Sequence, residues 1–338
     1  MATMRAVQID QPGGPDNLYV GEVPVPELRD REVLLKVYAS AINRADTLQR
    51  EGKYPVPPGA STILGLEAAG TVEKCGPGVT RWKVGDRVTA LLTGGGNAEF
   101  ATVHEDHVIA IPAGMSFIRA AAIPEVWLTA FQILHTVGGF VPGDYVLIHA
   151  GGSGVGTSAV QLVKAAGGHA IVTAGTQEKI QKALALGAVA GFNYKEGEFA
   201  SKVKEVTKGK GVNLILDCVG ASYWPQNADA IATDGRWVLY GTLGGTKIEG
   251  DLFATILRKR VTLTGSTLRA RSVEYKAKLV KDFTAQCLEH FQSGQFETVI
   301  DRTFPLDQIA AAHHLMDSNK NIGKIIIEVR KESEHSEL

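Results

Sequence analysis

Two patterns of hydrophobic and polar positions divide the chain near residue 120. Before this point, short apolar runs at 32–40, 86–92 and 98–104 alternate with turns rich in proline and glycine, such as residues 54–61. Short runs of this kind are typical of β-strands joined by tight turns. The first 120 residues are therefore predicted to form a β-rich unit, followed by a helix-rich link at 116–140.

The second pattern consists of nearly continuous apolar runs separated by helical periodicity. Helical segments at 157–167 and 177–187 lie between these runs. Buried strands alternating with helices predict a doubly wound parallel sheet of the α/β class, covered on both faces. The predicted strands are residues 144–150, 169–174, 212–220, 236–243 and 261–266. Two further helices (275–291 and 306–316) and a strand (324–329) are predicted at the end.

A glycine-rich loop joins the first of these strands to its helix. It contains Gly151, Gly152, Ser153, Gly154, Val155 and Gly156. Such a loop lets the backbone approach a pyrophosphate, whose charge the helix N-terminus stabilises. Ser153 stands where the strict motif has its second glycine, and a plain structural turn could also use these glycines. The strand–loop–helix context favours a dinucleotide site.

The end of the second predicted strand bears on the choice of cofactor. An NAD-binding unit of this kind carries an acidic residue there for the ribose hydroxyls. This chain has Gly175 at the strand end, and Glu178 already lies in the following helix. Small residues and the cationic Lys179 leave room and charge for a 2′-phosphate. The sequence favours NADPH, although Lys179 alone also fits an ordinary solvated helix lysine.

Candidate metal ligands and nucleophiles are scarce. The three cysteines are isolated and have no histidine or acid at ligand spacing, so we expect neither zinc nor disulfides. His149, at a strand end, is predicted to be a core histidine. His313 and His314 are adjacent on a predicted helix and point in different directions, so we expect surface or capping roles. No nucleophile elbow is evident.

Composition and charge limit the classes of partner that the chain is expected to bind. The 35 basic and 36 acidic residues give a net charge of −1, and this balance offers no field for nucleic acid. The longest apolar stretch, residues 145–163, is broken by glycines and reads as strand and helix instead of a membrane span. The opening residues lack the apolar region of a secretory signal. We expect a cytoplasmic protein without membrane or nucleic-acid partners.

Longer motifs add a family resemblance. The chain resembles the zeta-crystallin-like quinone oxidoreductases of the medium-chain dehydrogenase/reductase superfamily. Within this family it is most similar to the branch that a tumour suppressor induces in animals. The matching segments are NRAD at 43–46, PPGAS at 57–61, ILGLEAAG at 63–70, VGDRV at 84–88, PEVWLTAF at 124–131, GDYVL at 143–147, the glycine loop with Gln161 and Lys164, and KNIGK at 320–324.

The resemblance implies a domain organisation and a metal-free site. A GroES-like catalytic domain at 1–124 would be interrupted by a Rossmann NADP-binding domain at 125–266 and resumed at 267–338. Zinc-dependent relatives carry cysteine at the position of Asn43 and histidine at that of Leu66. Both ligands and the structural cysteine lobe are missing, which implies a zinc-independent NADPH reductase.

The resemblance also implies roles for individual residues. Asn43, Asp46 and Tyr54 would face the nicotinamide and the substrate, with helix capping as the alternative for the first two and a turn tyrosine for the third. Besides the glycine loop, the implied cofactor contacts are Thr129, Gly175, Lys179, Tyr194, Cys218, Gly241, Leu243 and Asn321. Some relatives have an arginine near Asn321 that this chain lacks.

The leading hypothesis is hydride transfer from NADPH to a quinone bound in an interdomain cleft. One alternative is reduction of activated carbon–carbon double bonds, for which a positioned acid is useful and Tyr54 is the candidate. Another is a non-catalytic, crystallin-like NADPH-binding protein. Relatives imply a homodimer through the predicted edge strand at 261–266.

Overall fold

The computed structural model describes residues 2–332 and divides into two compact units. Unit 1 contains the chain up to Leu128 and again from Leu268, and unit 2 contains residues 129–267. The sequence-based boundaries at 124 and 266 lie four residues (128 − 124) and one residue (267 − 266) before these divisions. The helix α3 (Pro124–Phe131) crosses the first division.

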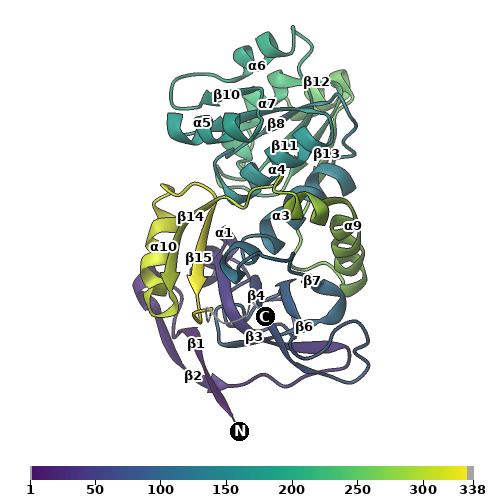
Figure 1. Cartoon of the computed structure of the whole chain (residues 1–338). Helices are drawn as coiled ribbons and strands as arrows, with labels where there is room; N and C mark the ends of the chain where they lie inside the picture. Colours follow the sequence, from purple (N-terminus) through teal and green to yellow (C-terminus); the bar gives the residue numbers. More distant parts are fainter. Residues whose placement is uncertain (1, 333–338) are drawn as a thin grey trace. The chain divides into compact units, whose positions relative to one another are not determined.

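Unit 1 is built on a seven-stranded sheet of order β14-β15-β3-β4-β5-β7, with β6 also paired to β3, and a separate β1-β2 ribbon (Figure 1). Its strands are β1 (Thr3–Ile9), β2 (Leu18–Pro24), β3 (Glu32–Ile42), β4 (Glu67–Cys75), β5 (Arg87–Leu91), β6 (Phe100–His104), β7 (Val108–Ala110), β14 (Ile300–Pro305) and β15 (Lys324–Glu328). Its helices and 3₁₀ turns are η1 (Pro15–Asn17), α1 (Arg44–Arg50), η2 (Glu105–His107), α2 (Phe117–Ala120), α9 (Val273–Gln292), η5 (Leu306–Gln308) and α10 (Ile309–Asp317).

Long-range pairing closes unit 1. The strand β15 near the end of the chain pairs antiparallel with β3, so that Ile325 lies opposite Ile42. Apolar side chains from β3, β4, β5 and β6 fill a core cluster that includes Leu35, Val72 and Val88. The alternation of buried and exposed positions along these strands comes from the two-residue period of β-structure.

Unit 2 has a six-stranded parallel sheet of order β10-β9-β8-β11-β12-β13, which confirms the predicted doubly wound sheet. Its strands are β8 (Tyr145–Ile148), β9 (His169–Ala174), β10 (Ala190–Asn193), β11 (Val212–Asp217), β12 (Ile231–Leu239) and β13 (Thr262–Gly265). Its helices and turns are η3 (Gln132–Thr136), α4 (Gly154–Ala165), α5 (Gln177–Leu186), α6 (Ala200–Val206), η4 (Ala221–Tyr223), α7 (Trp224–Ala230) and α8 (Leu252–Lys259).

The topology of unit 2 indicates where a ligand would bind. From β8 the chain proceeds to β9 and β10 on one side and then returns to β11 on the other. In open α/β sheets, ligands bind beyond the carboxyl ends of the strands at such a reversal. The loop after β8 lies at this point.

The histidines behave differently from one another. His149 is fully buried between the Thr173 hydroxyl (2.8 Å) and Asn227 (2.7 Å), as predicted. The expectation of a surface or capping role for His313 is wrong, because this side chain is fully buried. The helix α10 directs it into unit 1, where its Nδ1 lies 3.1 Å from Arg50, whereas its neighbour His314 is exposed and pairs with Asp16.

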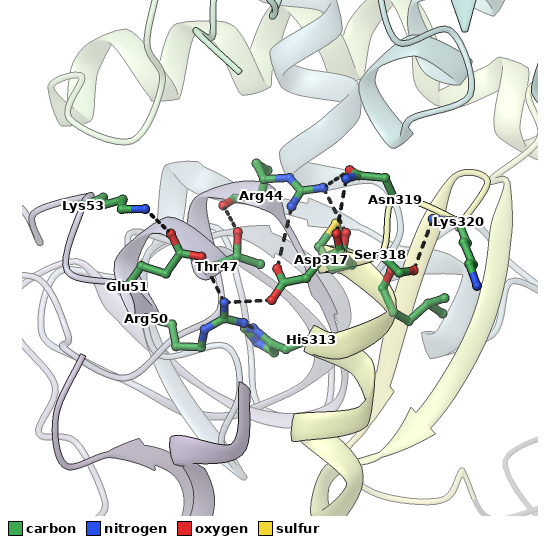
Figure 2. Close-up of polar contacts among 12 residues, drawn as sticks. Arg44, Thr47, Arg50, Glu51, Lys53, His313, Asp317, Ser318, Asn319 and Lys320 are labelled. Carbon is green, nitrogen blue, oxygen red and sulfur yellow. Dashed lines mark hydrogen bonds and ion pairs between the residues drawn. The ribbon is translucent and has the colours of Figure 1, made fainter. Parts of the chain in front are cut away.

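The contact between α1 and α10 is polar (Figure 2). Figure 2 shows Arg50 of α1 lying between His313 and Asp317 of α10, with Arg44 on the other side of Asp317. Arg50 lies 2.8 Å from Asp317 and 3.2 Å from Glu51. These ion pairs fix the end of α10 and thereby the start of the segment that leads into β15.

One helical window in the described part of the chain, Phe117–Thr136, is long and apolar enough to span a membrane by length and composition. Within the folded chain 78% of this window is buried, as in the core helix of a soluble protein.

Candidate functional site

The glycine loop of unit 2 forms a turn between β8 and α4. Ala150 adopts a left-handed conformation (φ 53°), which non-glycine residues rarely do, and this bends the chain away from the strand. The Ser153 hydroxyl then accepts a hydrogen bond from the Gly156 amide (3.0 Å) and caps α4. Ser153 therefore replaces the second glycine of the motif as an N-cap residue.

The space around the loop explains its glycines. A Cβ on Gly151 would lie 2.5 Å from Val172, and one on Gly156 would overlap the carbonyl oxygen of Ala150. The latter position packs α4 closely against the loop. The sequence therefore uses glycine here for close approach of backbone segments.

The loop presents unpaired backbone donors at a helix N-terminus. The amides of Gly151 and Ser153 donate to Thr173 and Ala150. Those of Gly152, Gly154 and Val155 have no acceptor within residues 2–332. Free amides together with the positive end of the helix dipole form a site for an anion such as a pyrophosphate.

A second group of predicted residues gathers beside this loop. The side chain of Lys179, in the first turn of α5, lies against Gly152, where an added Cβ would be 2.7 Å from its Cγ. The Tyr194 hydroxyl lies against Gly175, 2.6 Å from the position of a Cβ there. A larger residue at Gly175 would displace Tyr194. The structure therefore brings Lys179 to the loop and Tyr194 to Gly175, at adjacent strand ends.

The remaining cofactor candidates of unit 2 follow β11 and β12. The Leu243 amide donates to the carbonyl of Cys218 (3.1 Å), and Gly241 packs on Cys218. Leu243 is exposed and Cys218 is buried, so the backbone and Leu243 are the parts that a ligand can contact.

Two predicted cofactor residues, Thr129 and Asn321, belong to other elements than this group of strand-end residues. Thr129 lies on α3, and no hydrogen bond links it to the glycine loop. Asn321 belongs to unit 1, where its amide donates to the carbonyl of Gly323 (3.0 Å). Their contacts with the cofactor remain predictions.

In unit 1, Asn43 belongs to a buried charged network. Its amide nitrogen donates to Glu67 Oε1 (2.8 Å), and its amide oxygen accepts from Lys324 Nζ (2.7 Å). Lys324 also forms an ion pair with Glu67 Oε1 (2.7 Å). Lys324 and Glu67 are both buried, so each neutralises the other, and together they fix the orientation of the Asn43 amide.

The Asp46 side chain forms hydrogen bonds within the protein. Its two carboxylate oxygens accept hydrogen bonds from the amides of Asn43 (2.8 Å) and Gly65 (2.9 Å). The side chain is fully buried, and burial raises its pKa to about 6 against the opposing effect of these hydrogen bonds. Asp46 thereby caps the start of α1 and connects it to the segment before β4. Helix capping is the alternative role given for this residue in the sequence analysis.

Tyr54 lies beside two ionisable side chains. The Arg269 guanidinium carbon is 5.4 Å from the centre of the Tyr54 ring, and its Nε donates to the carbonyl of Thr93 (2.9 Å). Burial and the nearby Glu125 raise the pKa of Tyr54. Tyr54 therefore stays a neutral phenol that can donate a hydrogen bond.

A cavity of about 1100 Å³ also opens in unit 1. Arg269 and Lys276 are among its lining residues, whereas Tyr54 and Asn43 are not. The volume alone admits a ring-sized ligand. Tyr54 and Asn43, which are predicted to contact the substrate, do not line this cavity. The candidate substrate site is therefore the group of polar residues around Tyr54.

The sequence analysis missed Glu67, Glu125, Arg269 and Lys324. Glu67 and Lys324 lie inside quoted motifs, GLE and NIGK, but their pairing joins residues 257 positions apart (324 − 67). Charged residues inside otherwise apolar strand segments were the available signal, because such residues are seldom buried unless paired.

Two protein-family models match parts of the chain. The model described as "Alcohol dehydrogenase GroES-like domain" matches residues 29–113. The model described as "Zinc-binding dehydrogenase" matches residues 154–300.

Individual proteins match nearly the whole chain. The quinone oxidoreductase of Lama guanicoe is 30% identical over 96% of this chain and 97% of its own length. The 2-haloacrylate reductase of a Burkholderia species is 32% identical over 96% and 98%. The crystal structure of Escherichia coli quinone oxidoreductase complexed with NADPH matches with a TM-score of 0.86 and 30% identity, covering 97% of this chain and all of that chain.

The residues present fit a dinucleotide better than a zinc ion. The amides of Gly152, Gly154 and Val155 have no acceptor within residues 2–332 and lie at the N-terminus of α4, as suits a pyrophosphate. By contrast, no group of three or more His, Cys, Asp or Glu suited to a metal occurs among residues 2–332. An ammonium group, Lys324 Nζ, already contacts the oxygens of Asn43 and Glu67.

Proposed function

The chain belongs to the family of the quinone oxidoreductases, and on this premise we propose that it transfers hydride from NADPH to a quinone. The observation that carries the proposal is the cradle of free amides at Gly152, Gly154 and Val155 beside Lys179, with Tyr194 at the next strand end. Similarity to the NADPH complex of the Escherichia coli enzyme supports the choice of cofactor.

The residues of unit 2 would hold the cofactor. The loop amides and the N-terminus of α4 would bind its pyrophosphate, and Lys179 with Tyr194 would bind the 2′-phosphate. NADPH, when bound, supplies the hydride. The protein has to orient the acceptor and exclude water from it.

The residues of unit 1 would hold the quinone. Tyr54, a neutral phenol, would donate a hydrogen bond to a quinone oxygen. The Asn43 amide, fixed by Glu67 and Lys324, would orient the nicotinamide or the quinone. We further propose that the reaction is independent of zinc, because a lysine ammonium takes the place of a metal beside Asn43.

Similarity to a 2-haloacrylate reductase keeps reduction of activated double bonds as a second candidate. In that reaction a carbon atom has to be protonated. A positioned acid would therefore accelerate it more than it accelerates the reduction of a quinone. Loss of activity on an enone in Tyr54→Phe, with quinone reduction preserved, would favour this candidate.

We also propose a homodimer in the cytoplasm. Among residues 2–332, the edge strand β13 pairs with β12 alone, and an exposed edge offers backbone groups to a second copy. Phe253 and Leu257, in the preceding helix α8, are 84% and 78% exposed. No disulfide joins Cys75, Cys218 or Cys287 within residues 2–332, which supports a reducing compartment.

The first experiment is to titrate the purified protein with NADPH and with NADH and then to follow NADPH oxidation. Saturating ortho-quinones, para-quinones and one enone serve as acceptors. NADPH-preferring binding with quinone-dependent oxidation is expected. Turnover confined to the enone would establish the second candidate, and tight NADPH binding without turnover would leave a cofactor-binding protein. A preference for NADH would overturn the roles of Gly175 and Lys179.

A further inference from the structure

A second acidic residue, Glu125, lies next to the buried Glu67 in unit 1. The backbone amide of Glu125, in the first turn of α3, donates to Glu67 Oε2 (2.9 Å). The other oxygen of Glu67 accepts from Asn43 (2.8 Å) and pairs with Lys324 (2.7 Å). Both oxygens of Glu67 therefore have partners, whereas the carboxyl oxygens of Glu125 receive no hydrogen bond from residues 2–332.

This arrangement keeps a proton on Glu125. Burial, then the charge of Glu67 and also that of Asp46, raise the pKa of Glu125 to about 8, while Lys324 and Lys276 oppose this shift. Repulsion between neighbouring carboxylates is relieved when one of them is protonated. Glu125 is consequently a neutral acid near pH 7.

Two further side chains interact with the carboxyl group of Glu125. Tyr54 and Arg269 both interact electrostatically with Glu125, and they belong to the loops before β4 and before α9. Glu125 thus lies in the cluster that contains Tyr54, the residue proposed to contact the quinone. The Glu125 side chain is partly exposed, so it can exchange its proton with water.

The other candidates for a proton donor are less suitable. Asp46 is fully buried and accepts two backbone hydrogen bonds. Glu67 is paired with Lys324 as an ion. The pKa of Tyr54 is raised above its ordinary value, which makes the phenol a weaker acid.

We propose that Glu125 is the general acid of the substrate site and gives its proton to the reduced quinone. This inference rests on the proposed function, because the hydride must come from NADPH. Addition of hydride to the quinone produces the hydroquinone monoanion. The O–H bond of Glu125 then breaks, an O–H bond forms on the hydroquinone oxygen, and the Glu125 carboxylate regains a proton from water.

The direction of this transfer follows from acidity. An ordinary phenol has a pKa of about 10, and the pKa of Glu125 is about 8. Transfer from the carboxyl group to a phenolate is therefore favourable. A carboxyl group with an ordinary pKa would be ionised at neutral pH and would have no proton to give.

The first test measures protonation without turnover. Infrared spectra of the cofactor-free protein are recorded from pH 5 to pH 10 for the natural chain, Glu125→Gln and Glu274→Gln. Glu274 is a matched control because it also lies in the first turn of a helix of unit 1, α9, but is exposed. We expect a protonated-carboxyl band that titrates near pH 8 and is missing only in Glu125→Gln. Absence of such a band in the natural chain would overturn the proposal.

The second test uses single-turnover oxidation of bound NADPH by a quinone. We expect the rate of the natural chain to fall as pH rises through about 8, because the deprotonated acid cannot donate. Glu125→Gln should lose this pH dependence, and its rate at pH 7 should fall about 100-fold, the lower end of the range for loss of a general acid. Glu125→Asp should retain the pH-dependent limb, whereas Glu274→Gln should match the natural chain.

The outcomes distinguish failure of the acid role of Glu125 from failure of the proposed function. If the natural chain oxidises NADPH with quinones and Glu125→Gln has the same rate and pH profile, the acid role is wrong and the proposed function stands. If no quinone is reduced by the natural chain, the proposed function fails, and with it the role of Glu125, even where the infrared band confirms a protonated carboxyl group.

Discussion

At the scale of single residues, close approach and burial set the properties of the two candidate sites. Gly156 is required because α4 begins against the loop backbone. His313 is kept neutral because it is buried next to a cation. Each case yields a substitution whose effect can be compared with that of a similar residue elsewhere in the chain.

Gly156→Ala should weaken both the fold and cofactor binding. Its Cβ would meet the carbonyl oxygen of Ala150 and lie 2.8 Å from Gly151 Cα, so that α4 must shift. We expect a loss of about 1–3 kcal/mol in the free energy of unfolding and weaker binding of NADPH, measured by urea denaturation and fluorescence titration. Gly14→Ala is the control, since a Cβ there has no neighbour within 4 Å. Equal behaviour of the two variants would contradict the packing argument.

His313 should make the stability depend on pH. Burial, followed by the positive charges of Arg50 and His314, lowers its pKa to about 3 in the folded chain, against about 6.5 when unfolded. The unfolded state therefore binds the proton more readily between these values, and stability falls as pH decreases from 6.5 toward 3. The slope contributed is about 1.4 kcal/mol per pH unit.

His313→Gln should remove this slope, because glutamine does not titrate. Urea unfolding at pH values from 4 to 7 measures the difference between the variant and the natural chain. The neighbouring exposed residue gives the control His314→Gln, which should keep the slope. A slope that is the same in all three chains would show that His313 is not the group responsible.

At the scale of elements, polar side chains join helices that are distant in the sequence. The end of α10 is fixed to α1 by Arg50, which is 1% exposed, and by Arg44. Apolar periodicity predicts that such helices exist and which face is buried. It does not predict an ion pair that spans 267 residues (317 − 50).

Asp317→Asn should destabilise unit 1. The substitution removes the charge that lies 2.8 Å from the buried Arg50 guanidinium, while Glu51 at 3.2 Å remains as a partner. We expect a cost of about 1–3 kcal/mol, measured by urea denaturation. Asp307→Asn breaks an exposed pair with Arg5 and should change stability by less than about 0.5 kcal/mol. A loss no greater than that of the control would contradict the role assigned to Asp317.

At the scale of the whole molecule, the proposed dimer depends on the edge of the sheet in unit 2. Leu263→Lys places a charge on the edge strand β13, and charged side chains on an edge oppose pairing. In sedimentation equilibrium we expect a natural chain of about twice 36.0 kDa and a variant shifted toward the monomer. Val84→Lys, at an exposed apolar residue of unit 1, should leave the mass unchanged. A dimer that survives Leu263→Lys would place the interface elsewhere.

Local sequence patterns predict the parallel sheet of unit 2, which the structure confirms, and a glycine loop suited to a dinucleotide. Strands such as 169–174 and the helix near 177–187 follow from local periodicity, and a glycine loop between strand and helix has few structural uses. Shorter elements, including α1, α7 and β10, were not predicted, because they contain too few residues for a periodic signal. The start of β12 at Ile231 lies five residues before the predicted one (236 − 231), because Gly235 and Asp234 interrupt its apolar pattern.

The chemistry of unit 1 depends on contacts between segments that are distant in the sequence. The pairing of Lys324 with Glu67, the capping use of Asp46 and the position of Glu125 beside Glu67 join residues from β15, β4, α1 and α3. Local sequence fixes backbone preference and the pattern of burial, whereas the pKa of a carboxyl group depends on charges that the fold brings within a few ångströms. The sequence therefore predicts where a dinucleotide binds, whereas the proton proposed for Glu125 depends on charges that only the folded chain brings together.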